Sequence, residues 1–290
     1  MSVETILEVE GLAKRYEGFA LENVSFRLPR GHVMGLIGPN GAGKTTTLRL
    51  LLGLVRPSGG RIRMFGDDPS LHGAALRRRM GFVQDEPRFY RHLSLAANAG
   101  LVRRFYPTWS PETFRRLAAQ FGLPLRKRFG RLSRGNRTRF ALAVALSHRA
   151  ELILMDEPTT GLDPVFRREL LDELGDVLHQ EEASILFSTH ITADLDRLAD
   201  YVTLLQRGRV VFSAEKDRIL DGWGLVKGGN ELLEGLPSGF FRGIRRGRHG
   251  FEALTDDAAA ARARFGAAAI VERPTLEDVV LHTTAEAIDA

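Results

Sequence analysis

The spacing of hydrophobic and polar residues changes twice along the chain. Up to residue 84, short apolar runs are separated by Gly and Pro, a pattern typical of strands joined by tight turns. We expect strands at residues 6–9, 24–28, 33–37, 61–65 and 81–83, with one helix at 46–54. This part of the chain is therefore predicted to form the first half of an α/β core.

Between residues 85 and 149 the pattern becomes helical, and beyond residue 151 strands return. Helices are expected at 95–105, 111–121 and 134–148, where Ser110 and Ser133 stand at N-cap positions. Strands and helices then alternate at residues 152–155, 164–180, 184–188 and 192–199, before two short strands around Arg207 and Gly208. Such alternation predicts a mainly parallel sheet covered on both faces, with ligands at the carboxyl ends of its strands.

The last part of the chain has a pattern of its own. We expect strands at residues 224–227, 240–245, 250–254 and 268–272, with a helix at 256–265. The predicted organisation is an α/β domain over residues 1–220, with a helical insertion at about 85–149, and a small α+β appendage over residues 221–290.

Composition narrows the class of protein. The 290 residues are 43% hydrophobic and 27% charged, and no apolar run reaches the ~18 to 20 residues of a membrane span. The N-terminus lacks the basic and apolar regions of a secretory leader. Because cysteine is absent, disulfides and thiolate metal sites are excluded. The net charge of +5 comes from scattered arginine clusters, which favours solvated faces over a nucleic-acid site, although the latter is the alternative.

The stretch GPNGAGKT, residues 38–45, matches GxxxxGK[ST] at every fixed position, between a predicted strand and a predicted helix. Its glycines let backbone N–H groups converge on phosphates, Lys44 adds a positive charge, and Thr45 offers a hydroxyl to Mg²⁺. An ordinary Gly-rich turn is the alternative. The predicted phosphate-binding residues are Gly38, Pro39, Asn40, Gly41, Ala42, Gly43, Lys44, Thr45 and Thr46.

Two carboxylates follow the predicted buried strand at residues 152–155. Asp156 can hold Mg²⁺ directly or through water, and Glu157 can polarise a water for in-line attack on a γ-phosphate. A helix cap beside a solvated acid is the alternative reading of this pair. The phosphate loop in the same domain favours the metal reading, with a nucleoside triphosphate and Mg²⁺ as ligands.

The order of these motifs resembles the ATP-binding subunits of ABC transporters over about residues 3–215. GPNGAGKT is similar to the Walker A loop, and residues 152–157 are similar to Walker B with its catalytic glutamate. LSRGN, residues 132–136, resembles the ABC signature, and Gly161-Leu162-Asp163 resembles the D-loop. The resemblance implies an α/β fold of the P-loop NTPase type, with a RecA-like core, an antiparallel β subdomain and a helical subdomain.

Three further residues match family positions, and each has a plain alternative. Tyr16 resembles the aromatic residue that stacks on adenine, but it could instead be a loop tyrosine packed on the core. Gln84 resembles the Q-loop glutamine, a catalytic residue and Mg²⁺ ligand, or it is a solvated strand end. His190 resembles the switch histidine, which would hold the attacking water together with Glu157, although a core histidine is the usual default.

The signature segment departs from the usual LSGGQ at two of its five positions, where Arg134 and Asn136 stand. The resemblance implies that Ser133 and Gly135 touch the γ-phosphate of ATP bound to an opposite protomer, with Asp163 also at the nucleotide. Arg134 adds positive charge near a triphosphate, so we hypothesise that it supports ATP-dependent dimer closure; the alternative is that it points to solvent.

The resemblance also implies partners. Because Ser133 would complete the site of another copy, we expect a homodimer or pseudo-dimer with two ATP molecules between the subunits. A separate integral-membrane permease is expected to dock beside Gln84, where Phe89 and Tyr90 would be either exposed anchors or core residues. The protein is then expected in the cytoplasm, peripheral on the cytoplasmic face of the cell membrane.

Residues 273–281, RPTLEDVVL, look like a C-terminal helix of bacterial exporter ATPases, which favours export of a drug, antibiotic, lipid or similar substrate. The tail could instead bind a regulator, stabilise the dimer or extend the core. A ribosomal ABC ATPase would carry two such domains, and a chromosome-type one would carry long heptad helices. A GTPase or kinase would need an NKxD motif or a phosphoacceptor site. None of these features is evident, and no nucleic-acid partner is expected.

Overall fold

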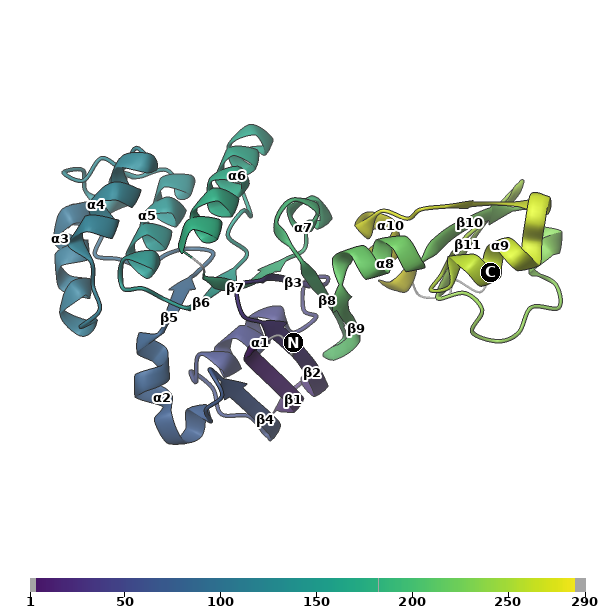
Figure 1. The fold of residues 1–290 in the computed structure, drawn as a ribbon, viewed down its shortest axis with the longest axis horizontal. Helices are drawn as coiled ribbons and strands as arrows, with labels where there is room; N and C mark the ends of the chain where they lie inside the picture. Colours follow the sequence, from purple (N-terminus) through teal and green to yellow (C-terminus); the bar gives the residue numbers. More distant parts are fainter. Residues whose placement is uncertain (1–3, 182, 285–290) are drawn as a thin grey trace.

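The computed structural model describes residues 4–284 apart from residue 182, and a six-stranded sheet lies at its centre (Figure 1). Five of its six strands run parallel, and the edge strand β9 is antiparallel to its neighbour β8, which confirms the expected mainly parallel sheet. The order across the sheet is β5 (Met80–Val83), β6 (Leu152–Asp156), β7 (Ser184–Thr189), β3 (Val33–Ile37), β8 (Tyr201–Gln206) and β9 (Arg209–Glu215).

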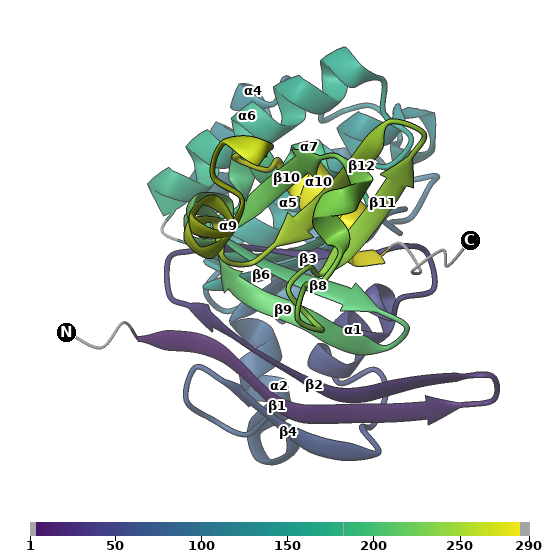
Figure 2. The ribbon, with the colours of Figure 1, turned by 90° about the vertical axis from the view of Figure 1, so that its right-hand side faces the viewer.

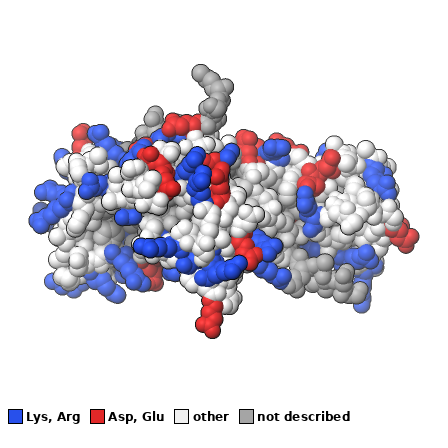
Figure 3. All heavy atoms as spheres, turned by 90° about the horizontal axis from the view of Figure 1, so that it is seen from below, with Lys and Arg blue, Asp and Glu red and all other residues white. Residues whose placement is uncertain are grey.

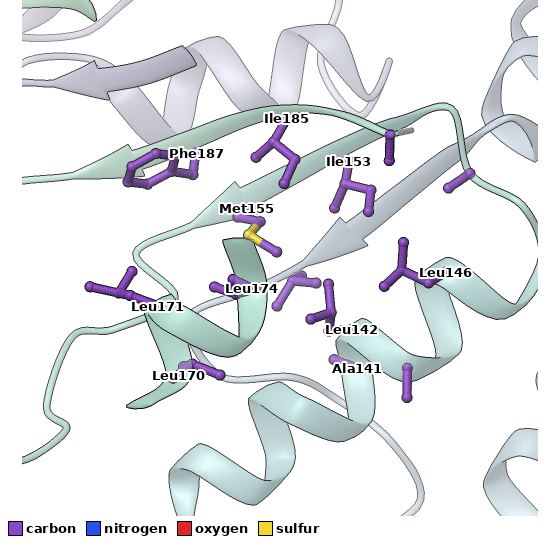
Figure 4. Close-up of a cluster of buried hydrophobic side chains, with 14 of the residues drawn as sticks. Ala141, Leu142, Leu146, Ile153, Met155, Leu170, Leu171, Leu174, Ile185 and Phe187 are labelled. Carbon is purple, nitrogen blue, oxygen red and sulfur yellow. The ribbon is translucent and has the colours of Figure 1, made fainter. Parts of the chain in front are cut away.

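Successive residues of a strand point to opposite sides of the sheet, and in this sheet both sides are covered. On one face, α5 (Arg134–Ser147) and α6 (Pro164–Glu181) pack against Ile153 and Met155 of β6, as Figure 4 shows. On the other face, Leu152 and Leu154 join a cluster that includes α1 (Lys44–Leu51). Among the described residues, no helix has both the length and the apolar character needed to cross a bilayer.

A second, antiparallel sheet extends the first part of the chain. It has the order β2 (Phe19–Pro29), β1 (Thr5–Tyr16) and β4 (Gly59–Met64). The strand predicted at residues 6–9 is therefore only the start of β1, which reaches Tyr16. The sequence did not predict α2 (Pro69–Arg78). Gly73 weakens the helical pattern there, and in the structure the backbone of His72 departs from helical geometry.

The helical part lies at the left of Figure 1 and includes α3 (Leu95–Val102), α4 (Pro111–Gln120) and α5. Ser94, Ser110 and Ser133 each cap one of these helices by accepting a backbone N–H three residues ahead. The helix expected at 95–105 ends at residue 102, and a 3₁₀ turn (Arg103–Phe105) continues it. A second 3₁₀ turn (Phe129–Arg131) precedes the signature segment.

The C-terminal part forms its own antiparallel sheet at the other end of the molecule (Figures 1 and 2). The strand predicted at 240–245 is wrong at its start, because Phe240 and Phe241 pack on Phe265 instead of extending. The order of strands in this C-terminal sheet is β11 (Gly243–Gly247), β12 (Gly250–Thr255), β10 (Gly224–Gly228) and β13 (Ala269–Glu272). The accompanying helices are α8 (Lys216–Gly222), the 3₁₀ turns Asn230–Leu233 and Gly266–Ala268, α9 (Ala258–Phe265) and α10 (Leu276–Thr284). The domain limits at residues 85, 149 and 220 stay predictions.

A buried carboxylate joins three segments at the carboxyl ends of the parallel strands. Asp194, in α7 (Thr192–Leu198), is fully buried and accepts hydrogen bonds from the hydroxyls of Thr159 at 2.6 Å and Thr189 at 3.2 Å. Arg167 of α6 donates from Nε to its other oxygen at 2.6 Å. Asp194 therefore holds the loop after β6, the end of β7 and the start of α6 in one arrangement.

The substitution Asp194→Asn should cost about 3–5 kcal/mol of unfolding free energy, because it leaves the Arg167 charge without its buried partner. Asp172→Asn is the matched control, since Asp172 pairs with Arg197 but is 62% exposed, and it should cost less than about 1 kcal/mol. Urea unfolding of both variants checks this, and equal losses would contradict the assigned role of Asp194.

His148, at the end of α5, is a second buried titratable group. Its ring stacks on Tyr106 at 3.9 Å between centroids, and its Nδ1 has no hydrogen-bond partner among the described residues. Burial lowers the pKa of His148 to about 4, from an ordinary value of 6.5. The unfolded chain therefore takes up this proton at a higher pH than the native protein does.

Stability should fall as the pH drops from about 6.5 towards about 4, by about 2–3 kcal/mol from this residue alone. His148→Phe keeps a ring against Tyr106 but cannot titrate, so unfolding free energies measured between these limits should depend less on pH. His249→Gln, at an exposed position of the tail, is the control. An unchanged pH dependence in His148→Phe would show that the buried imidazole does not cause it.

Candidate functional site

The predicted phosphate loop connects β3 to α1, and its backbone needs glycine. Gly41 and Gly43 have φ values of 80° and 110°, which residues with a side chain rarely adopt. Gly43 is the N-cap of α1, so the helix begins at Lys44 and not at residue 46 as expected. Gly208 donates its N–H to the Ala42 carbonyl at 3.0 Å. The loop is thereby fixed against the turn between β8 and β9.

Lys44, Glu157 and His190 meet at the carboxyl ends of β3, β6 and β7. The Lys44 ammonium lies 3.2 Å from Oε1 of Glu157 and donates to the Gly38 carbonyl at 2.7 Å. His190 Nδ1 lies 2.7 Å from Oε2 of Glu157, and the Thr160 hydroxyl donates to the same oxygen at 2.8 Å. The structure thus brings together three residues that the sequence places up to 146 positions apart.

The environment of Glu157 keeps its carboxyl ionised. Burial by itself would raise the pKa of Glu157, but the hydrogen bond from Thr160, the charge of Lys44 and the contact with His190 hold it below its ordinary value. The backbone of Glu157 is left-handed, with φ of 49°, and its N–H is held by Ser188. A carboxylate anion is therefore held in one position beside the phosphate loop.

Asp156 and Thr45, two of the three predicted metal ligands, are in contact with each other. The Thr45 hydroxyl donates to Oδ1 of Asp156 at 3.2 Å, and the Ser188 hydroxyl donates to the same oxygen at 2.7 Å. Carboxylate and hydroxyl oxygens are hard ligands of the kind that Mg²⁺ takes beside substrate phosphates and water. The donor set fits Mg²⁺. Gln84, the third predicted ligand, is half-buried after β5, and among the described residues no hydrogen bond links it to Asp156.

The candidate base-stacking residue is placed at the tip of the β1–β2 hairpin. Tyr16 is 44% exposed and pairs across the strands with Phe19. A β-carbon built on Gly43 would lie 3.1 Å from the Phe19 ring, so this end of the hairpin borders the phosphate loop. The Tyr16 ring is thus available beside the loop, with Lys14 Nζ over it at 5.4 Å.

The signature residues are arranged around the start of α5. The Ser133 hydroxyl accepts the N–H of Asn136 at 3.4 Å, so it caps the helix. Arg134, the first residue of α5, adopts an ordinary helical conformation and pairs with Asp85. A β-carbon on Gly135 would collide with the ring of Phe166, a packing reason for glycine that the sequence reading did not supply. Among the described residues, no hydrogen bond or ion pair joins this segment to Lys44 or Glu157.

Two other predicted positions have different surroundings. Asp163 is exposed and accepts the N–H of Phe166 at 3.0 Å, which caps the start of α6. Phe89 and Tyr90 were expected to be either exposed anchors or core residues, and the structure places them differently from each other. Phe89 packs on Phe129 and Phe140 with ring centroids at 5.2 and 4.8 Å, whereas Tyr90 is 61% exposed.

Several site residues escaped the sequence reading. Thr160 and Ser188 hold the two carboxylates, and their positions next to Glu157 and His190 in sequence were the available signal. The last helix was also unexpected here. Val280 and Thr284 of α10 line a hollow of about 300 Å³ together with Ile37, Gly38, Pro39, Asn40 and His190. Gln206 donates to the Thr284 carbonyl at 3.0 Å, so the tail borders the phosphate loop.

Comparison with known proteins agrees with this geometry. The sequence profile described as ABC transporter matches residues 21–160. The bacitracin transport ATP-binding protein of Enterococcus faecalis is 30% identical over 214 residues, covering 73% of this chain and 70% of that protein. The lantibiotic transport ATP-binding protein of Streptococcus pyogenes is 34% identical over 215 residues, covering 73% and 92%. The Nod factor export ATP-binding protein I of Ralstonia nicotianae is 33% identical over 225 residues, covering 74% and 68%.

Solved structures give the same result. An ATP-binding subunit of an ABC transporter superposes with a TM-score of 0.66 at 30% identity, covering 74% of this chain and 92% of that one. The cbiO1 protein of Clostridium perfringens, part of the ABC transporter complex cbiONQ, gives 0.65 at 26% identity, covering 73% and 89%. With its phosphate loop, paired carboxylates and sheet order, the chain belongs to the family of ATP-binding subunits of ABC transporters.

Proposed function

We propose that this protein hydrolyses ATP to ADP and phosphate and thereby powers a separately encoded membrane permease. The observation that carries the proposal is the contact of Lys44, Glu157 and His190 beside a glycine-rich loop at the amino end of α1. A cation for phosphates, an ionised base and a histidine are the parts that in-line attack of water on a γ-phosphate requires. The fold supplies the three residues from the segments that follow β3, β6 and β7.

The residues can be assigned to steps of this reaction. The loop N–H groups and Lys44 bind the β- and γ-phosphates, and the triphosphate then competes with Glu157 for the Lys44 ammonium. The Glu157 carboxylate, released from that ion pair, accepts a proton from the attacking water. His190 holds the γ-phosphate and the water in line. Tyr16 provides a face for the adenine ring, which is worth about 1–3 kcal/mol.

The metal site completes the arrangement. Thr45 and Asp156 would hold Mg²⁺, with Gln84 as the third predicted ligand after a movement of its segment. When bound, Mg²⁺ neutralises negative charge on the β- and γ-phosphates. Ser188 keeps Asp156 in place through its hydroxyl, so the metal ligand and the Glu157 backbone depend on the same side chain.

A dimer follows from the position of the signature residues. Among the described residues, Ser133, Gly135 and Asn136 make no hydrogen bond or ion pair with Lys44, Glu157 or His190 of their own chain, and Asp163 is exposed at the end of the loop that follows Glu157. We infer that they complete the nucleotide site of a second subunit, in a homodimer or pseudo-dimer closed by ATP and opened by hydrolysis. The similarity to bacitracin, lantibiotic and Nod factor transport proteins supports export of a related substrate.

The permease is proposed to dock beside Gln84, where Tyr90 is exposed, and this would place the protein on the cytoplasmic face of the cell membrane. Phe89 is not available as an anchor for the permease, because its ring packs against Phe129 and Phe140. It can instead transmit movement of the docked partner to the helical part, since its ring is in contact with α5 through Phe140.

Arg134 links three motifs within the chain. Its guanidinium pairs with Asp85, which directly follows Gln84, and lies against Gly161, where an added β-carbon would collide with it. A triphosphate bound to the opposite subunit would offer Arg134 more negative charge than one carboxylate does. We infer that Arg134 exchanges Asp85 for the γ-phosphate when the dimer closes, and that this exchange releases the segment of Gln84.

The substitution Glu157→Gln should lower ATP turnover by about 10²–10⁴-fold and leave an ATP-bound dimer, because nucleotide binds but the base is lost. Phosphate release and size-exclusion chromatography with light scattering measure the two effects. Lys44→Ala is the comparison variant and should weaken nucleotide binding itself. A Glu157→Gln protein that stays monomeric at every ATP concentration would argue against the proposed dimer.

Changing Arg134 in the Glu157→Gln background separates its role from turnover. Arg134→Gly should raise the ATP concentration needed for dimerisation by about 10-fold, the effect of losing a charge-assisted contact. Asp85→Asn should lower that concentration, because the guanidinium is no longer held. Arg131→Gln, an exposed arginine three residues earlier, is the control. If Arg134→Gly leaves nucleotide affinity, dimerisation and turnover unchanged, the pair of Arg134 with Asp85 takes no part in closing the dimer.

A further inference from the structure

The positive charge of this protein is concentrated in its helical part. Residues 85–149 contain 14 Lys and Arg against 3 Asp and Glu, a net charge of +11, whereas the whole chain carries +5. The remaining residues together therefore carry −6. Figure 3 shows one face of the molecule, on which blue side chains prevail over red ones at the left end, which in Figure 1 is occupied by α3 and α4.

Two segments of the helical part lie side by side and gather these charges. Gly130 donates its N–H to the Arg91 carbonyl at 2.9 Å, and Leu95 donates to the Lys127 carbonyl at 3.1 Å. Ser94 and Arg128 form a bridge between the same segments. The pairing of residues 91–96 with residues 125–130 therefore makes one continuous ribbon from two stretches that are some thirty residues apart in sequence.

The two paired segments and the residues that flank them carry six exposed basic side chains, which together we call the basic ribbon. Among the described residues, none of the six forms an ion pair with an acidic side chain, and residues 87–96 and 121–133 contain no Asp or Glu. Its members are Arg88, Arg91, Arg126, Lys127, Arg128 and Arg131.

The basic ribbon is firmly attached and contains an exposed aromatic residue. The Phe129 ring, in the middle of the second segment, packs against Phe89 and Phe140 in the core of the helical part. Tyr90 is 61% exposed and stands edge-on to His92, with ring centroids 6.0 Å apart. Tyrosine beside arginine and lysine is a combination typical of protein surfaces at the membrane interface, where the ring sits at the level of the headgroups.

We propose that the basic ribbon binds the anionic headgroups of the membrane leaflet that surrounds the permease. The proposal rests on the proposed location of the protein at the cytoplasmic face, because the ribbon begins four residues after Gln84, where docking is expected. Charge decides between lipid and permease as the occupant. Cytoplasmic loops of membrane proteins carry an excess of Lys and Arg and would repel the ribbon, whereas the cytoplasmic leaflet is negatively charged.

Contact of the basic ribbon with the headgroups would orient the ATPase on the membrane surface, in addition to its contacts with the permease. Basic side chains attract an anionic surface only within about one Debye length, ~8 Å at physiological ionic strength, so the ribbon must face the headgroups closely. Binding of this kind holds Tyr90 and the segment of Gln84 at the height of the membrane surface. The expected attraction corresponds to roughly five-fold in affinity for each basic residue.

The test is co-sedimentation of the full chain with lipid vesicles, without permease and without nucleotide. Vesicles of equal parts phosphatidylcholine and phosphatidylglycerol should bind the protein, and vesicles of phosphatidylcholine alone should not. Binding should vanish near 1 M salt, where the Debye length is ~3 Å. Replacing Arg126, Lys127 and Arg128 together by Gln should weaken binding about 100-fold while leaving basal ATP turnover unchanged.

The matched control replaces Arg245, Arg246 and Arg248 of the tail by Gln, which removes the same number of exposed charges from another part of the molecule. This control should bind vesicles as the unchanged protein does. Equal loss in both variants, or no loss in the ribbon variant, overturns the proposal. Displacement from vesicles by RNA or duplex DNA of equal charge, with tighter binding to that nucleic acid, would also overturn it.

Failure of this proposal and failure of the proposed function are distinguishable. If the unchanged protein hydrolyses ATP but ignores anionic vesicles, the lipid contact is wrong and the ATPase assignment stands. If it binds anionic vesicles through the basic ribbon but does not hydrolyse ATP, the ribbon stands and the assigned catalytic residues are wrong.

Discussion

The ion pair between Lys44 and Glu157 is the contact on which the site depends. It joins the phosphate loop to the end of β6, and the 3.2 Å separation holds the Lys44 ammonium and the Glu157 carboxylate in one partly enclosed place. Lys44 is 6% exposed, so its charge must always have a partner. In the proposed mechanism, phosphate and carboxylate are alternative partners for the same ammonium, so nucleotide binding would free the carboxylate of Glu157.

The parallel sheet makes this ion pair possible. Because β3, β6 and β7 run in the same direction, the residues that follow each of them emerge at one edge, where the chain can collect Lys44, Glu157 and His190. The buried Asp194 then fixes the segments after β6 and β7 to α6 through Thr159, Thr189 and Arg167. Thr159, in the loop after β6, and Thr189, next to His190, are therefore joined through one buried carboxylate.

Local sequence patterns predicted the elements that carry the site but not all their limits. The buried strand before Asp156 and the three helices of the helical part were predicted, two of them with their caps Ser110 and Ser133, because apolar runs and N-caps act over a few residues. The helix α2 was missed because Gly73 and His72 weaken its pattern, and the strand expected from Phe240 was displaced by packing of its two phenylalanines. The fold class was predictable, whereas these details depended on contacts with distant residues.

By itself, the sequence determined the chemistry of the phosphate loop, since GPNGAGKT sets its own backbone geometry and carries its own ligands. It also determined that a carboxylate pair leaves a buried strand. Only the tertiary structure decided that Arg134 meets Asp85, that Phe166 covers Gly135, and that residues 91–96 pair with residues 125–130. These contacts join residues up to 49 positions apart, and such contacts form only when the whole core packs, which no local pattern encodes.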